Sequence, residues 1–157
     1  MERLNLPTYS FNTKYEGERT LIFDIFRNRW VVLTPEEWVR QHMARYLADD
    51  LGYPASLILL EGSLNLNGMV RRCDLLVHDR EGHPVMIGEC KAPEVKISQK
   101  VFDQLARYNL SLGVGLLLIT NGLEHYCLQS EPGTEGYSFL PEIPQFGSLA
   151  SQSSRRI

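Results

Sequence analysis

Short apolar runs alternate with charged and turn-forming segments along the chain, and their spacing predicts both strands and helices. Two runs of branched and aromatic residues, 21–26 and 30–33, flank the polar sequence RNR and predict an N-terminal hairpin. A second hairpin is expected from residues 69–78 and 85–91, with the turn sequence DREG between them. Shorter apolar runs predict further strands at residues 57–60, 114–120 and 124–129.

The first predicted helix begins at a capping box. Thr34 can cap the helix, and Glu37 stands three residues later, as the Thr-x-x-Glu pattern requires. The helix is expected to run to about Asp50. Glu36 lies beside its apolar stripe, where a carboxylate can reach a site formed by neighbouring strands. Glu37 points away from the stripe, so we expect it only to favour the helix N-terminus through the helix dipole.

The second predicted helix covers residues 99–110 and presents Gln104 and Tyr108 together, four positions apart. The order of elements is then hairpin, helix, strands, helix, strand, strand. This order predicts a single α/β domain with a central mixed β-sheet flanked by helices. Its parts are an N-terminal extension with the hairpin (1–33), the core (34–130) and a C-terminal tail rich in Gly, Pro and Ser (131–157).

Period-two alternation assigns faces to the second predicted hairpin. It puts Asp74 and Leu76 on one face of the first strand and Cys73 on the opposite face. It puts Glu89 and Lys91 on one face of the return strand. Charged residues at the end of an otherwise apolar strand are costly unless they are paired, which favours a functional site over a solvated surface.

The pairing of acidic residues on neighbouring strands points to metal-assisted phosphodiester hydrolysis. Two facing carboxylates repel unless they share a cation or a proton. A hard divalent cation prefers oxygen ligands, and it can activate water and stabilise the charge that develops on a phosphate. We therefore expect Asp74, Glu89 and the backbone carbonyl of Cys90 to hold such a cation. Lys91 would orient the attacking water or balance charge on the phosphate.

These residues resemble the motif of the PD-(D/E)xK nuclease superfamily. Asp74, Glu89 and Lys91 match its acidic residues and lysine, and Gln104 with Tyr108 matches the QxxxY helix of one of its branches. Cys73 stands where the motif has a proline, a change that removes no ligand.

A more specific resemblance extends over about residues 20–130. The segments LTPEEWVRQ, RCDLLVHD, ECKAPEVKISQKVFDQLARYN and ITNGLEHYC resemble the N-terminal nuclease domain of type I restriction enzyme R subunits. The resemblance implies a restriction-endonuclease-like core and a DNA endonuclease activity that depends on Mg²⁺, or on Mn²⁺. It also implies that Glu36 assists the metal, and that partner subunits of a restriction-modification or other DNA-processing system are involved. The chain has no GxxxxGK[ST] phosphate-binding loop, so we expect no ATP-driven motor in it.

The charge of the chain gives the nuclease hypothesis only local support. The net charge is −3, whereas most nucleic-acid-binding modules are basic. Residues 71–107 carry seven basic and six acidic side chains, so the balance there is nearly even. The candidate phosphate contacts are Arg40, Arg72, Lys96 and Lys100. The acidic total leaves open a second interpretation, a non-catalytic module that keeps the nuclease fold and binds nucleic acid or protein.

The amino-acid composition limits the class of protein and the compartment in which we expect it. Hydrophobic residues make up 43% and charged residues 22% of the 157 positions, as in a soluble globular domain. The longest apolar run, 114–119, is too short to cross a membrane, and the N-terminus has no apolar segment typical of a secretory signal. Three scattered cysteines suggest neither a disulfide framework nor a zinc cluster, so we expect a cytoplasmic protein. A C2 homodimer would suit double-strand cleavage.

Overall fold

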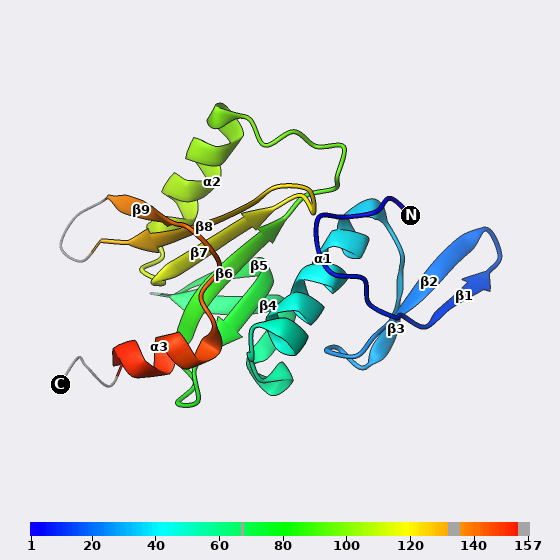
Figure 1. The fold of residues 1–157 in the computed structure, drawn as a ribbon, viewed down its shortest axis with the longest axis horizontal. Coiled ribbons are helices and arrows are strands. Elements are labelled where there is room, and N and C mark those ends of the chain that lie inside the picture. The colour runs from blue at the N-terminus through cyan, green and yellow to red at the C-terminus, as the bar shows by residue number, and fades with distance from the viewer. Residues whose placement is uncertain (67, 132–135, 154–157) are drawn as a thin grey trace.

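A six-stranded mixed sheet forms the centre of the computed structural model, which describes residues 1–66, 68–131 and 136–153. Its strands lie in the order β4 (Ile58–Leu66), β5 (Met69–His78), β6 (Pro84–Cys90), β7 (Leu116–Thr120), β8 (His125–Ser130) and β9 (Tyr137–Leu140) (Figure 1). Neighbouring strands are antiparallel except β6 and β7, which are parallel because helix α2 (Gln99–Leu110) connects them as a crossover. The expected α/β fold with a central mixed sheet flanked by helices is confirmed.

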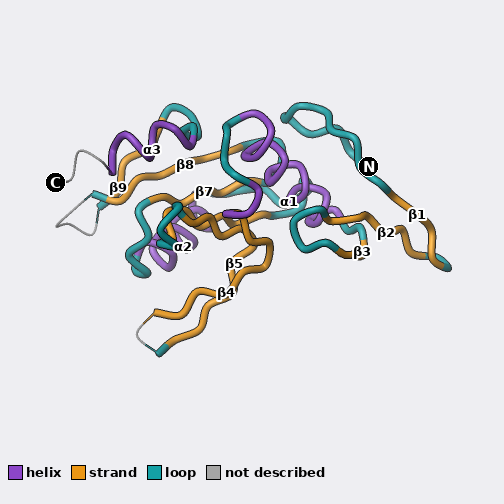
Figure 2. Tube along the Cα trace, turned by 90° about the horizontal axis from the view of Figure 1, so that it is seen from below, coloured by secondary structure: helices purple, strands orange, loops and turns teal. Residues whose placement is uncertain are grey.

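Helices cover both faces of this sheet. Helix α1 (Pro35–Arg45) continues as a π-helical turn (Tyr46–Asp50), and a 3₁₀ turn (Ala55–Leu57) leads into β4. Helices α1 and α3 (Phe146–Ser153) lie on one side of the sheet and α2 lies on the other (Figure 2). None of the helices in the described part of the chain is long and apolar enough to cross a membrane.

Alternation along the strands divides the core in two. The α1-side core contains buried residues such as Val39, Met43 and Leu118, and the α2-side core contains Phe102 and Leu117 among others. The central strand β7 is buried at all five positions because it contributes to both cores. The two cores together fix the positions and orientations of β5, β6 and α2, which carry most of the candidate site.

Alternation in β5 breaks at Asp74. Cys73 packs with Leu76 in the α2-side core, although the two residues were predicted to lie on opposite faces. The break coincides with Glu61 of β4, which lies opposite Asp74, has a left-handed φ of 52° and interrupts the β4–β5 pairing. Asp74 instead contacts Arg40 of α1, so the prediction that it shares a face with Leu76 is wrong. Regular alternation cannot anticipate such a local break.

The N-terminal extension forms a separate three-stranded antiparallel sheet at one end of the molecule (Figure 1). The predicted hairpin is present as β2 (Arg19–Asp24) and β3 (Arg29–Val32), and β1 (Thr13–Glu16) adds a strand that the sequence pattern did not predict. Asp24 is fully buried and organises the β2–β3 turn by accepting a hydrogen bond from the Phe26 N–H at 2.8 Å.

The C-terminal tail is more ordered than its composition predicted. It contains β9, which pairs with β8, and α3, whereas residues 132–135 and 154–157 lie outside the described part of the chain. Aromatic contacts hold both elements: Phe139 stacks on Phe102 with ring centroids 5.2 Å apart, and Phe146 meets Tyr53 at 5.4 Å. Aromatic ring contacts therefore override the turn-forming composition of this segment.

Gly88 of β6 is required by the close approach of Leu75 across the β5–β6 pair. A Cβ atom at Gly88 would lie 2.7 Å from the Leu75 Cβ, which is fixed to the backbone. We expect Gly88→Ala to lower the free energy of unfolding by about 1–3 kcal/mol, measured by urea denaturation. Gly115→Ala is the matched control, because nothing lies within 4 Å of a Cβ there, and it should change stability by less than about 0.5 kcal/mol. Equal effects of the two substitutions would contradict this account.

Candidate active site

The candidate site lies where β5 and β6 separate. Their backbone pairing ends at Leu75 and Gly88, so Asp74 and Glu89 are the next residues on the two strands. Strand β6 stays with β7 to its end, while the Cys90 N–H donates to the Asp74 Oδ2 at 2.8 Å. A carboxylate thus takes the hydrogen bond that a backbone carbonyl of β5 would accept in a continuing ladder.

Arg40 of α1 holds Asp74. Its Nη2 donates to the Asp74 Oδ1 at 3.0 Å and to the Glu36 Oε1 at 3.1 Å. Its Nη1 donates to the Glu37 Oε1 at 2.7 Å. Burial lowers the pKa of Arg40, but the negative charges of Glu37 and Asp74 outweigh burial, and the net pKa lies above the usual arginine value. Arg40 therefore connects the first turn of α1 to β5 through charge-assisted hydrogen bonds.

Glu89 points to the opposite side of the sheet, toward α2. Its Oε1 accepts a hydrogen bond from Arg71 Nη2, which also donates to the Asn109 Oδ1 at 3.0 Å. The Arg71 guanidinium lies 4.2 Å from the centroid of the Tyr108 ring. Burial and then the negative charge of Asp74 raise the pKa of Glu89 to about 7, with Arg71 giving a partial offset.

The donor set fits a hard divalent cation. Asp74 lies close enough to Glu89 for its negative charge to raise the pKa of Glu89, and both carboxylates offer oxygen, the ligand that Mg²⁺ and Mn²⁺ prefer. Lys91 follows at the end of β6, anchored by its N–H to the Thr120 carbonyl at 2.9 Å, and its charge lowers the pKa of Glu89. The Cys90 carbonyl as a third ligand stays a prediction.

The other predicted catalytic residues reach this centre to different degrees. Glu36 is joined to Asp74 through Arg40, and its side chain is 47% exposed. Tyr108 contacts Arg71 and is 50% exposed. Gln104 is exposed on α2, and its side chain makes no hydrogen bond with any described residue, so the structure does not join it to the carboxylates.

The predicted phosphate contacts divide into two groups. Arg72, Lys96 and Lys100 are exposed, as a contact to nucleic acid requires. Arg40 is only 6% exposed and is paired with carboxylates, so the structure gives no support to its role as a phosphate contact. The i, i+3 spacing of Glu37 and Arg40 in the helix carried a signal for this pairing.

Glu37 has a larger role than the one predicted for it. Its carboxylate is buried between two guanidinium groups, those of Arg40 and Arg27, the latter at 2.8 Å. Arg27 comes from the β2–β3 turn, pairs with Asp24 there, and reaches Glu61 Oε2 at 3.0 Å. The prediction that Glu37 only favours the helix N-terminus is wrong, because a helical projection cannot include a partner from the β2–β3 turn.

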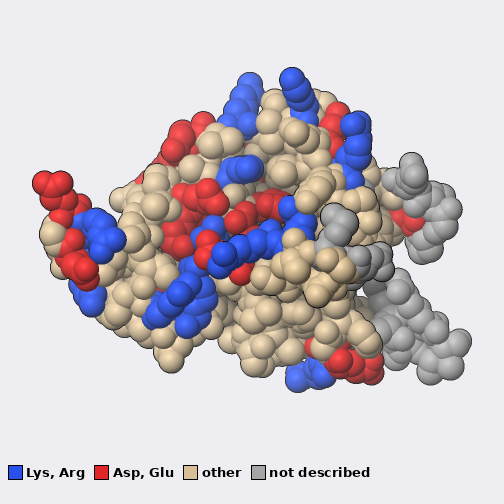
Figure 3. Space-filling view, turned by 180° about the vertical axis from the view of Figure 1, so that it is seen from behind, with Lys and Arg blue, Asp and Glu red and all other residues tan. Residues whose placement is uncertain are grey.

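Arg71 and Asn109 were also missing from the predicted site. The sequence signal for Asn109 is its position next to Tyr108, and for Arg71 its position three residues before Asp74. Seen from behind the view of Figure 1, acidic side chains gather in the middle of the surface with basic side chains beside them (Figure 3).

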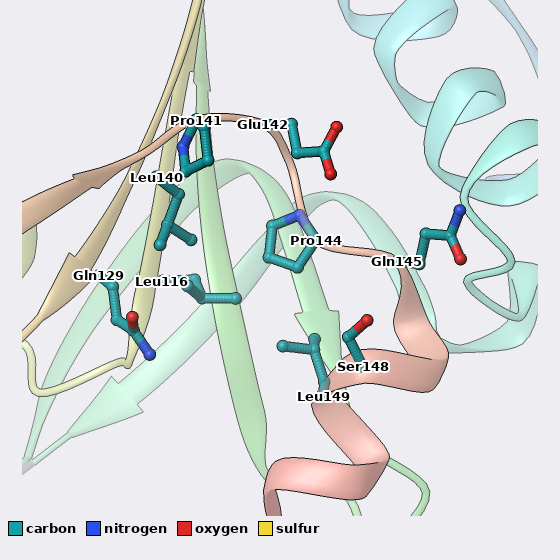
Figure 4. A pocket seen from close by; sticks show the side chains of 9 residues that line it. All are labelled: Leu116, Gln129, Leu140, Pro141, Glu142, Pro144, Gln145, Ser148 and Leu149. Carbon is teal, nitrogen blue, oxygen red and sulfur yellow. The ribbon is translucent and has the colours of Figure 1, made fainter.

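A separate cleft of about 430 Å³ lies between α3 and the strands β7 to β9 (Figure 4). Its lining is mainly leucine and proline, including Leu116, Leu140, Pro144 and Leu149, with Glu142 as its acidic side chain. It contains none of the residues predicted for catalysis, metal binding or phosphate contact.

Comparison with known proteins agrees with the sequence resemblance. A family described as "Type I restriction enzyme R protein N terminus" matches residues 35–144, which is more than half of the chain. No curated protein sequence matches.

Two solved structures are similar. One, from Vibrio vulnificus YJ016, is described as a fragment of an R subunit of a type I restriction enzyme; it is 20% identical, with a TM-score of 0.49 over 78% of this chain and 26% of that chain. The other, from Anabaena variabilis ATCC 29413, is described as a nuclease; it is 13% identical, with a TM-score of 0.47 over 87% of this chain and 88% of that one. This chain therefore spans about a quarter of the R-subunit fragment.

Removal of Arg40 should destabilise the fold. Arg40→Met leaves buried Glu37 with one guanidinium instead of two and frees the Asp74 Oδ1. We expect the free energy of unfolding to fall by about 3–5 kcal/mol, measured by urea denaturation. Arg72→Met is the control, because this arginine is 70% exposed and lies 3.8 Å from its carboxylate, and it should cost less than about 0.5 kcal/mol. A loss for Arg40→Met no larger than the control would refute the role given to this network.

The raised pKa of Glu89 should appear in a titration of the metal-free protein. Carboxyl ¹³C NMR should report a pKa near 7, and Asp74→Asn should lower it because the neighbouring negative charge is gone. Because the folded pKa exceeds the unfolded value, the protonated carboxyl stabilises the fold fully at low pH, and this stabilisation is lost as pH rises through about 7. The stability advantage of the native chain over Glu89→Gln should therefore shrink between about pH 5 and about pH 8. A titration at the ordinary glutamate value of about 4.3 would contradict the burial argument.

Proposed function

Because this chain belongs to the family of type I restriction enzyme R protein N termini, we propose that it is a DNA endonuclease domain that hydrolyses phosphodiester bonds with Mg²⁺ or Mn²⁺. The observation that carries the proposal is the meeting of Asp74 and Glu89 at the separation of β5 and β6, with Lys91 beside them. Two close carboxylates, one of them buried, form a site for a cation.

In this proposal Asp74 and Glu89 hold the cation, with the Cys90 carbonyl as a third ligand. The bound cation supplies a water of lowered pKa and stabilises the charge that develops on the phosphate. Arg40 keeps Asp74 oriented, as hydrogen-bonded partners of metal-binding carboxylates do. Glu36 shares Arg40 with Asp74 and assists the same centre from α1.

Lys91 acts on the reacting groups. Hydrolysis forms a bond between water oxygen and phosphorus, breaks the bond to the leaving oxygen, and moves a proton from the water to that oxygen. The Lys91 ammonium group lies close enough to Glu89 to affect its pKa, so it can orient the water or balance charge on the phosphate. Gln104 and Tyr108 face the substrate from α2, and Arg72, Lys96 and Lys100 provide exposed contacts to the DNA backbone.

The wider setting is also a proposal. Because the chain belongs to a family of restriction-enzyme subunit N termini, we propose that it works in the cytoplasm with other subunits of a DNA-processing system. A C2 dimer would present one site to each strand of a duplex.

A second candidate function is a module that keeps the fold and binds nucleic acid or protein without cleavage. One observation favours it: Asp74 is paired with Arg40 and Glu89 with Arg71, so each proposed ligand already has a cationic partner. Such permanent pairing would make a divalent cation unnecessary. Calorimetry separates the two candidates, because this one predicts DNA or protein binding without any binding of Mg²⁺ or Mn²⁺.

Cleavage of supercoiled plasmid and single-stranded DNA tests the nuclease proposal. With Mg²⁺ or Mn²⁺, Asp74→Ala and Lys91→Ala should each reduce cleavage by more than about 100-fold while circular dichroism shows an intact fold. Asp49→Ala is the matched control, because Asp49 is also paired with an arginine, Arg45 at 2.9 Å, but lies outside the site. DNA left intact by the unmodified protein across a metal series, or full activity in Asp74→Ala, would defeat the proposal.

A further inference from the structure

Arg71 binds Glu89, one of the two proposed metal ligands, and is itself held in place by residues of α2. It lies on β5, and its Nη2 contacts both Glu89 and the Asn109 Oδ1, the latter at 3.0 Å. The Asn109 amide is itself oriented by its Nδ2, which donates to the Leu105 carbonyl at 2.8 Å. Tyr108 lies against the guanidinium at 4.2 Å. Two of the three contacts of Arg71 therefore come from α2 and do not involve Glu89.

The guanidinium also has unused hydrogen-bonding capacity. Its Nε is buried and has no hydrogen-bond partner among the described residues, and its hydrogen bonds to Glu89 and Asn109 both leave from Nη2. A buried donor without an acceptor is costly, and arginine prefers a fork of two parallel bonds to an oxyanion. The buried Nε would thus gain an acceptor only if the guanidinium moved.

Asp74 and Glu89 differ in how firmly their arginines are bound. Arg40 is held by Glu36 and Glu37 as well as by Asp74, and it is nearly inaccessible. Arg71 has one carboxylate partner, and its side chain is 19% exposed. A cation shared by Asp74 and Glu89 would compete with Arg71 for Glu89, whereas Arg40 would keep its other partners.

We propose that Arg71 is an exchangeable cation, bound to Glu89 before the metal binds and to a DNA backbone phosphate afterwards. The proposal rests on the proposed nuclease function and adds a substrate-binding residue to it. When Glu89 takes a cation, Arg71 loses that hydrogen bond but stays seated on Asn109 and the Tyr108 ring. The guanidinium then turns its free donors to the phosphate. Tyr108 in this scheme supports Arg71 rather than acting on the phosphate itself.

The test compares Arg71→Met with Arg45→Met in the full chain. Arg45 is a close match, because its side chain is also 19% exposed, pairs with Asp49 and lies over an aromatic ring, that of Tyr9, at 5.2 Å. Mn²⁺ binding without DNA is measured by calorimetry at fixed pH. Arg71→Met should bind Mn²⁺ about 5- to 10-fold more tightly than the unmodified chain, because the competitor for Glu89 is gone, and Arg45→Met should be unchanged.

DNA binding gives the second measurement, made with Ca²⁺ in place of a metal that supports cleavage and over a series of salt concentrations. Arg71→Met should bind a short duplex about 10-fold more weakly, with the salt-dependence slope reduced by about 1, because one phosphate contact is lost. Arg45→Met should keep the affinity and the slope of the unmodified chain.

The outcomes separate this proposal from the nuclease proposal. Weaker Mn²⁺ binding in Arg71→Met would mean that Arg71 only supports Glu89, and unchanged DNA binding would mean that it does not reach phosphate; either result overturns the exchange while leaving the nuclease function intact. Absence of Mn²⁺ binding and of cleavage in the unmodified chain would overturn both proposals. If Arg71→Met does not fold, Tyr108→Leu removes the half-exposed support, and it should weaken DNA binding about 3- to 10-fold while Mn²⁺ affinity stays within about 2-fold. Unchanged DNA binding in Tyr108→Leu would then count against the exchange.

Discussion

Neutralisation of buried carboxylates by arginine side chains is the constraint on which the rest of this structure depends. Burying a carboxylate without a partner costs several kcal/mol, and here Asp24, Glu37 and Glu89 are all buried. Each of them is matched by a guanidinium: Arg27 serves Asp24 and Glu37, and Arg71 serves Glu89. Arg40 of α1 pairs with both Glu37 and Asp74 of β5, so the β2–β3 turn, α1 and β5 must be in place together as one unit.

This arrangement explains why the N-terminal hairpin is more than a cover for the core. Its turn is shaped by Asp24, which positions Arg27 to bridge Glu37 of α1 and Glu61 of β4. Glu61 is also the residue whose left-handed backbone interrupts the β4–β5 ladder. Its carboxylate is thus held by an arginine from a second sheet at the point where β5 changes face. The orientation of Asp74 is set by contacts that extend through three separate elements.

The helices and strands and the clustering of the Asp-Glu-Lys motif were predicted well from the sequence, because both depend on local patterns. The capping residue Thr34 is found as the N-cap, accepting from the Glu37 N–H at 3.0 Å, and the Asp-Glu-Lys motif is gathered at one end of the hairpin. What failed depended on distant partners. The burial of Glu37 requires Arg27, and the face of Asp74 requires the break at Glu61, which a strict alternation of two cannot contain. Aromatic contacts likewise gave the C-terminal segment a strand and a helix that its Gly, Pro and Ser content concealed.

The break in alternation has a consequence for cooperativity. Asp74 belongs to the α1 side of the sheet and Glu89 to the α2 side, so any ligand that both carboxylates share would connect the two hydrophobic cores across the sheet. Binding there would raise the free energy of local unfolding on both sides of the sheet. A ligand that binds only the native state stabilises every segment whose unfolding would release the ligand. Amide hydrogens in α1 and α2, which are far apart in the sequence, would then exchange with solvent as one cooperative unit. The separation of β5 and β6 therefore connects the α1-side and α2-side cores, and a ligand bound there would determine how far the two cores fluctuate independently.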